Sequence, residues 1–224
     1  MGLTARLTTA IHEQRYQSYI DHPLRDLLAQ RTYQIAAGSA DANDAKSLRR
    51  DPLGKLGVER SPLDPTHDLA SATTFSRLEH HIDRQALYRL TRACVDHFIA
   101  SYAEPPAAIV LALDLSADPT YGPQAFAFYN NYYKNYYYLP LCIFEGMSQA
   151  LVMAPLRPGT PPPGAENAMI LVRLLSYLRR HWPYTPILVR GDSHFATPEV
   201  IAVITSSRWT DFVFGLASNA VLLR

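Results

Sequence analysis

Two aspartates end short apolar runs, and carboxylates in such places can bind metal ions. Asp114 ends the run 109–113, and Asp192 closely follows the run 187–189. Residues just past strand ends line the ligand crevice of open α/β sheets, so these carboxylates converge if the two strands are neighbours. Two cations held about 4 Å apart can stabilise both oxygens of a phosphodiester displacement, which predicts carboxylates within about 8 Å of each other. An aspartate at a strand end is also a common helix cap or turn residue, so the pair alone leaves both interpretations open.

The elements that would position these aspartates lie in the second half of the chain. Short apolar runs with β-branched residues are typical of buried strands. Along this half of the chain, strand-like apolar runs alternate with amphipathic helical segments, which predicts an α/β fold with a mixed sheet and flanking helices. Further strands are expected at 136–145, 151–156 and 212–214, and helices at 166–181 and 198–206.

The first part of the chain, residues 1–104, has helical periodicity interrupted by polar loops. Helices are expected to begin near Leu3, Pro23, Ser71 and Asp83, and the proline- and glycine-containing stretch 51–66 is expected to be a loop. Two consecutive prolines follow Glu104, which predicts a boundary between a helical region, 1–104, and a sheet-containing region, 105–224.

Composition points to an ordinary globular protein and excludes several classes. Apolar residues make up 48% and charged residues 18% of the 224 residues, and the formal net charge is +1, so composition alone does not indicate nucleic-acid binding. Cys94 and Cys142 are too few and too distant for a disulfide framework or a zinc site. The N-terminus lacks the apolar core of a signal peptide, and no run reaches membrane-spanning length, so we expect a cytoplasmic protein with no membrane partner.

The segments around both aspartates resemble the DDE transposases of bacterial insertion sequences, of the type called DDE domain group 1. The segment 113–124 resembles the first catalytic motif of that family, and the tyrosine-rich segment 129–141 resembles the strand motif that follows. Arg190-Gly191-Asp192-Ser193, with Phe195 after it, is similar to the second catalytic motif. Further similar blocks occur in the family's order at 41–44, 48–49, 51–52, 76–79, 156–159 and 212–219.

This resemblance implies a fold, a chemistry and partners. It implies a helical N-terminal region that binds DNA or dimerises, followed by the first part of a ribonuclease-H-like catalytic domain. Asp114 and Asp192 would hold Mg²⁺ or Mn²⁺. The intact protein would act as a homo-dimer on double-stranded DNA, cutting transposon ends and joining their 3′ hydroxyls to target DNA without a covalent enzyme intermediate.

The sequence also departs from the family pattern. Ala112 and Ala117 stand where the family often has aspartate, Tyr121 replaces a usual histidine, and His194 replaces a small residue beside the second aspartate.

The family's third carboxylate is a glutamate on a helix beyond the last strand seen here. Glu145 and Glu166 precede Asp192, and Glu199 follows it by only seven residues, so none of them fits that place. Met1 to Ile11 resembles an internal helix of the family. We therefore expect a chain truncated at both ends that cannot complete the chemistry.

Other interpretations stay open. The chain could be a catalytically dead remnant that binds DNA or dimerises. Less favoured is a phosphotransferase with Asp114 as its nucleophile, because such a site needs a lysine and the only lysine after residue 55 is Lys134. Asp118 could assist a metal site or cap the turn at Pro119, and the tyrosines of 129–138 could stack on bases, although strand packing explains most of them.

Overall fold

The computed structural model describes residues 2–120, 124–131 and 134–217, which form two compact units. The units comprise Met1–Ala93 and Cys94–Arg224. The division falls inside helix α5 (Arg84–Ile99), because Val95 and Phe98 belong to the hydrophobic core of the second unit. The motif positions Tyr121 to Pro123, Tyr132, Tyr133 and Asn219 lie outside the described residues.

The first unit is helical, as expected from its periodicity. Ser71 and Asp83 both act as helix caps: the Ser71 hydroxyl accepts a hydrogen bond from the Thr74 amide, and the Asp83 carboxylate accepts one from the Ala86 amide. Its elements are α1 (Leu3–Ala10), η1 (Gln17–Tyr19), α2 (Leu24–Ala36), η2 (Ala42–Arg50), α3 (Pro52–Gly57), α4 (Ala72–His80) and the beginning of α5, where η marks a 3₁₀ helix. None of the helices in the described parts of the chain is long and apolar enough to cross a membrane.

Helix α3 corrects the expectation of a loop over 51–66. The Asp51 carboxylate caps the helix by accepting a hydrogen bond from the Gly54 amide at 2.5 Å. Pro52 occupies the first turn, where its missing N–H costs nothing. The helix is further secured by Lys55, which is 2% exposed and donates to the Asp64 carbonyl. Proline here therefore begins a helix instead of excluding one.

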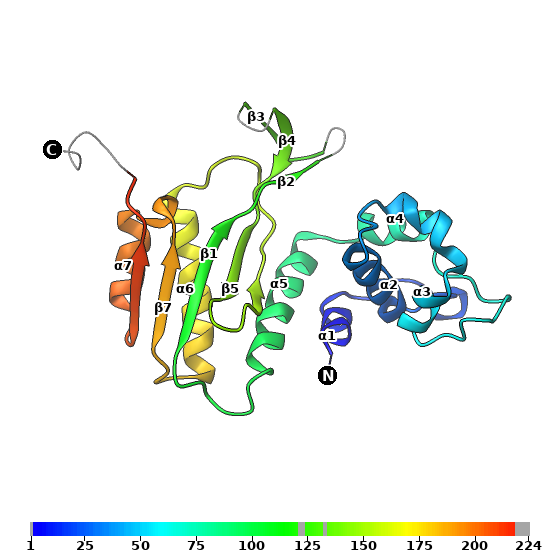
Figure 1. Ribbon diagram of the computed structural model, residues 1–224, viewed down its shortest axis with the longest axis horizontal. Helices are drawn as coiled ribbons and strands as arrows, with labels where there is room; N and C mark the ends of the chain where they lie inside the picture. Colours follow the sequence, from blue (N-terminus) through cyan, green and yellow to red (C-terminus); the bar gives the residue numbers. More distant parts are fainter. Residues whose placement is uncertain (1, 121–123, 132–133, 218–224) are drawn as a thin grey trace. The chain divides into compact units, whose positions relative to one another are not determined.

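The second unit is built on a mixed sheet of five strands in the order β6-β5-β1-β7-β8 (Figure 1). Strand β1 pairs antiparallel with β5 and parallel with β7, and β8 continues the parallel part. The expected α/β fold, with the strand of Asp114 beside the strand that leads to Asp192, is confirmed. The elements are β1 (Ile109–Leu115), β5 (Leu141–Glu145), β6 (Leu151–Met153), α6 (Gly164–His181), β7 (Ile187–Gly191), η3 (Ser193–Phe195), α7 (Pro198–Ser206) and β8 (Thr210–Phe214).

Alternation along the central strand separates a core face from an open face. Ile109, Leu111 and Leu113 are buried on the side that packs against α6. The apolar stripe of α6 completes this core with Leu171, Leu174, Leu175 and Leu178. Val110, Ala112 and Asp114 alternate with the buried residues, so they lie on the opposite face of the sheet.

The single strand expected at 136–145 is instead two strands in two sheets. β4 (Asn135–Tyr138) pairs with β2 (Asp118–Pro119) and β3 (Phe128–Asn130) in a separate three-stranded sheet, which projects from one end of the main sheet (Figure 1). The break falls at Pro140, which has no N–H to donate to a ladder. Strand β6 is also shorter than the expected 151–156.

Candidate active site at the end of the mixed sheet

The two aspartates lie at the same end of two adjacent parallel strands. The register of β1 and β7 joins Ile109 to Ile187 and Ala112 to Arg190. Asp192 directly follows β7 in an extended conformation, so continuing this register by two residues aligns Asp114 with Asp192. Paired positions on adjacent strands lie about 4.8 Å apart and direct their side chains to the same face.

The two carboxylates differ in their contacts. Asp114 is exposed on the open face of the sheet. The Asp192 side chain is 58% exposed, and it caps η3 by accepting a hydrogen bond from the His194 amide at 2.9 Å. The His194 ring lies against the same carboxylate, with its Nδ1 2.9 Å from the other Asp192 oxygen. Each carboxylate oxygen has two lone pairs, so Asp192 keeps acceptor capacity for a cation.

A third carboxylate contributes to the negative charge at this end of the sheet. Cys142 on β5 pairs directly with Asp114. Burial raises the pKa of the Cys142 thiol, and the nearby carboxylates of Asp114 and Asp118 raise it further. Asp118 is exposed on β2, four residues beyond Asp114. Within the described ranges, however, no group of three histidine, cysteine, aspartate or glutamate side chains is arranged to hold a metal.

Arg190 supplies a positive charge beside these carboxylates. It is exposed on β7, paired with Ala112, and shares the face of Asp114 and Asp192. No hydrogen bond or ion pair joins its guanidinium to another of the residues the structure describes. A free guanidinium next to an acidic site can contact a substrate phosphate.

The three glutamates weighed as a third metal ligand have structural roles in this unit. Glu145 is 2% exposed and accepts hydrogen bonds from the amides of Val110, Met147 and Ser148, which hold the turn after β5. Glu166 forms an ion pair with Arg157 at 2.9 Å. Glu199 is exposed in the first turn of α7, where a carboxylate complements the helix dipole.

Sequence reasoning missed Arg157 as an organising residue. Its side chain is 3% exposed and makes two contacts of 2.9 Å with the Glu166 carboxylate. Its carbonyl accepts a hydrogen bond from the Leu139 amide, just after β4. The sequence did contain a signal for this contact, because Arg157 and Glu166 carry opposite charges on either side of the turn at 158–164 and such a pair can close a turn.

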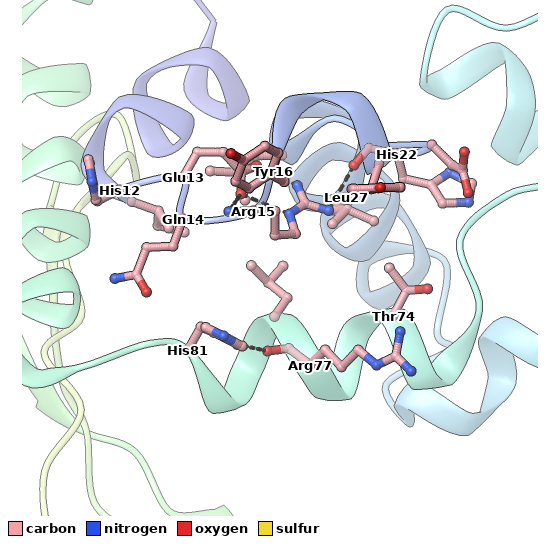
Figure 2. A pocket seen from close by; sticks show the side chains of 15 residues that line it. His12, Glu13, Gln14, Arg15, Tyr16, His22, Leu27, Thr74, Arg77 and His81 are labelled. Carbon is pink, nitrogen blue, oxygen red and sulfur yellow. Dashed lines mark hydrogen bonds and ion pairs between the residues drawn. The ribbon is translucent and has the colours of Figure 1, made fainter.

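The first unit contains a pocket of about 470 Å³ between the segment after α1 and helix α4 (Figure 2). Ile11, Leu24, Leu27 and Leu78 form its apolar lining. Arg15 is held by Glu13, with Nε 2.8 Å from the carboxylate, and that hydrogen bond lowers the pKa of Glu13. The polar side chains that line the pocket are His12, Glu13, Gln14, Arg15, Tyr16, Tyr19, Asp21, His22, Thr74, Arg77 and His81.

Comparisons with known proteins give one family and several distant structures. The family model described as Transposase DDE domain group 1 matches residues 1–224. Curated protein sequences contain no significant match.

Three solved transposase structures resemble the chain remotely. A piggyBac transposase synaptic complex with hairpin DNA is 14% identical, with a TM-score of 0.49 over 97% of this chain and 47% of that chain. The Mos1 strand transfer complex is 10% identical, with a TM-score of 0.33 over 96% and 72% of the two chains. The Drosophila P element transposase strand transfer complex is 11% identical, with a TM-score of 0.28 over 83% and 44%. The chain thus spans about half the length of the piggyBac protein.

Proposed function

Because the chain belongs to the transposases of DDE domain group 1, we propose that it carries part of the catalytic domain of a bacterial insertion-sequence transposase. The intact protein would cut the ends of its transposon and join the 3′ hydroxyls to target DNA. The observation that carries this proposal is the register of β1 and β7, which aligns Asp114 with Asp192 on the open face of the sheet.

Asp114 and Asp192 would hold Mg²⁺ or Mn²⁺, since oxygen ligands on an exposed, acidic sheet end suit hard divalent cations. A bound pair of such ions stabilises the attacking and the leaving oxygen of a phosphodiester displacement. Without cations, the carboxylates of Asp114, Asp118 and Asp192 would repel the DNA backbone. DNA binding at this site should therefore depend on divalent cations, and Arg190 would orient the phosphate from the same face.

The other parts of the chain receive roles in the same proposal. Residues 1–104 would bind DNA or dimerise, and residues 105–224 would form the first part of the catalytic domain. Double-stranded DNA at the transposon ends and in the target would be the substrate of a homo-dimer. A further carboxylate is required for full activity, because two aspartates leave the metal ions short of fixed oxygen ligands.

A second candidate function is non-catalytic DNA binding or dimerisation by this chain. It is favoured by one observation: within 2–120, 124–131 and 134–217, no three metal-ligating side chains are grouped. The phosphotransferase interpretation is weaker. Lys134 lies at the end of the projecting three-stranded sheet, beyond β3 and away from Asp114 along the chain.

The proposal is tested by titrating Mn²⁺ against the chain and following free Mn²⁺ by electron paramagnetic resonance. Asp114→Asn and Asp192→Asn should each weaken binding by about tenfold, which corresponds to losing roughly 1.4 kcal/mol. Asp211→Asn is the matched control, because Asp211 is exposed on the neighbouring strand β8 and pairs with Leu188 of β7. Equal binding by all four proteins would refute the metal site.

A further inference from the structure

The projecting three-stranded sheet carries two exposed tyrosines that packing does not require. We call this sheet the aromatic ribbon, which consists of β2 (Asp118–Pro119), β3 (Phe128–Asn130) and β4 (Asn135–Tyr138). Tyr129 and Tyr136 face each other across β3 and β4, with ring centroids 5.4 Å apart in an edge-to-face arrangement. Each of the two tyrosines is 52% exposed, so most of one ring face remains available to a partner.

The opposite side of the aromatic ribbon is fixed to the rest of the unit. Tyr137 alternates with Tyr136 along β4 and is 3% exposed. The Gly159 amide donates to the Phe126 carbonyl, and a Cβ on Gly159 would lie 2.0 Å from the Tyr137 carbonyl oxygen. The loop at Gly159 therefore packs directly against the back of the aromatic ribbon, and the side with Tyr129 and Tyr136 faces solvent.

The exposed side of the aromatic ribbon leads from the proposed active site. Asp118 pairs with Tyr138 in the ribbon and follows Asp114 by four residues, which is at most about 14 Å of extended chain. Tyr138 and Tyr136 lie two residues apart and so share this side, about 7 Å from each other. A DNA strand with its scissile phosphate at Asp114 would therefore have a nucleotide at the tyrosine pair within a few nucleotides of that phosphate.

The chemistry of the surface favours a nucleobase over a second protein chain. The exposed Lys134 precedes β4, so a cation lies close in the chain to Tyr136, whereas Asn130 belongs to the opposite side, where its amide donates to the Tyr137 hydroxyl. A lysine contacts phosphates, while aromatic rings stack on bases. Bases inside a duplex are already stacked on each other, so only an unpaired base offers its face to a tyrosine.

We propose that Tyr129 and Tyr136 stack on an unpaired nucleobase a few nucleotides from the scissile phosphate. This inference rests on the proposed function, because it takes the DNA strand at Asp114 and Asp192 as its starting point. The tyrosines position the DNA strand and do not touch the reacting atoms. Their contact would hold an unpaired end of the cut strand against the sheet.

The test compares two DNA probes with the full chain by fluorescence anisotropy in the presence of Mg²⁺, because DNA binding at the proposed site depends on a divalent cation. One probe is a duplex with an unpaired flap at one end, and the other is the same duplex fully paired. The variant Tyr129→Leu/Tyr136→Leu should bind the flapped probe at least about fivefold more weakly, which is the fold-change expected for losing the stacking of one base. Its affinity for the fully paired probe should not change. The variant Tyr129→Phe/Tyr136→Phe should bind both probes like the unmodified chain, because the aromatic faces remain.

The controls separate stacking from folding and from self-association. Tyr184→Leu removes a tyrosine that is 78% exposed in the loop before β7, at the other end of that strand, and it should change neither affinity. Unchanged binding of the flapped probe by the double leucine variant would overturn the inference, as would an equal loss for both probes. A shift of that variant from dimer to monomer in sedimentation would overturn it too, since the pair would then serve a second copy of the chain.

Failure of this inference can be distinguished from failure of the proposed function. If the unmodified chain binds Mn²⁺ through Asp114 and Asp192 but the leucine variant keeps its preference for the flapped probe, only the stacking inference is wrong. If the chain binds neither probe, the stacking inference falls together with DNA contact at the site. If Asp114→Asn and Asp192→Asn bind Mn²⁺ like the unmodified chain, but binding of the flapped probe still depends on the two tyrosines, only the metal site is refuted.

Discussion

Replacing Glu145 with glutamine tests how the site is held, because this carboxylate ties β1 to the turn after β5. One oxygen, Oε1, accepts a hydrogen bond from the Val110 amide at 3.1 Å, just at the beginning of β1. The other, Oε2, accepts from the Met147 amide at 3.0 Å and from the Ser148 amide and hydroxyl at 2.6 and 2.7 Å. In Glu145→Gln the amide oxygen can keep the three donors at the Oε2 position, and the NH₂ group then faces the Val110 N–H, from which it can accept no hydrogen bond.

The expected cost follows from those contacts. The Val110 N–H therefore loses its partner and stands against a second donor. An unsatisfied buried donor costs about 1–3 kcal/mol. We therefore expect the free energy of unfolding of the second unit to fall by about 1–3 kcal/mol.

The measurement is urea unfolding followed by tryptophan fluorescence, since Trp182 is 4% exposed in the core of this unit. Glu104→Gln is the control, because Glu104 is exposed and its loss should change the free energy by less than about 0.5 kcal/mol. A loss below about 1 kcal/mol in Glu145→Gln would refute the reasoning, because the turn would then not depend on the carboxylate.

The same variant has a defined pH dependence. Burial acts to raise the pKa of Glu145, but hydrogen bonds from Ser148, Val110 and Met147 outweigh it and hold the pKa below its ordinary value of 4.5. A lowered folded-state pKa contributes stability that is present above the unfolded value and is lost as pH falls through the folded value. The difference in stability between the unmodified chain and Glu145→Gln should therefore be constant near neutral pH and shrink below pH 4.5.

Three further predictions address the aromatic ribbon and the acidic site. Gly159→Ala should lower the free energy of unfolding in the same urea experiment by at least about 2 kcal/mol, since its Cβ would lie 2.0 Å from the Tyr137 carbonyl oxygen. Gly215→Ala is the control, because the Cβ added there would meet nothing nearer than 3.5 Å. His194→Ala should strengthen Mn²⁺ binding by about two- to tenfold, because it frees the Asp192 oxygen that now lies 2.9 Å from the ring, and weaker binding in a Mn²⁺ titration would contradict this. The 224-residue chain with Mg²⁺ or Mn²⁺ should not cleave or join DNA carrying transposon ends. Strand cleavage detected on a sequencing gel would mean that another carboxylate, such as Glu199, completes the site.

The helices and the central strands could be predicted because their patterns are strong and local. The helix over 198–206 begins at a proline and is capped by Thr197, and both signals are visible in the sequence. The strands of Asp114 and Asp192 follow from β-branched apolar runs of the right length. The break between β4 and β5 could not be predicted from hydrophobicity, because Leu139 and Leu141 continue the apolar pattern through Pro140. The decisive factor is that the two halves pair with different partners, β2 and β3 on one side and β1 on the other.

The candidate site was only partly predictable for a similar reason. Apolar runs ending in aspartate indicate that Asp114 and Asp192 lie at strand ends, and the order of strands then decides whether they meet. The contact of His194 with Asp192 depends on a side-chain rotamer, which sequence does not reveal. The position of Cys142 opposite Asp114 depends on the register of an antiparallel pair whose strands are 25 or more residues apart in the chain. Long-range pairing of this kind is set by the whole sheet.

The central claim, that Asp114 and Asp192 bind the same cation site, is tested most directly by iron-directed cleavage of the polypeptide. Fe²⁺ replaces Mg²⁺ at oxygen-rich sites, and with ascorbate and peroxide it generates radicals that cut the backbone close to the ion. We expect cuts near residue 114 and near residue 192 in the same sample, both of them lost in Asp114→Asn and both lost in Asp192→Asn. Cuts at one position that persist after the other aspartate is replaced would contradict the claim, because the two carboxylates would then bind cations independently.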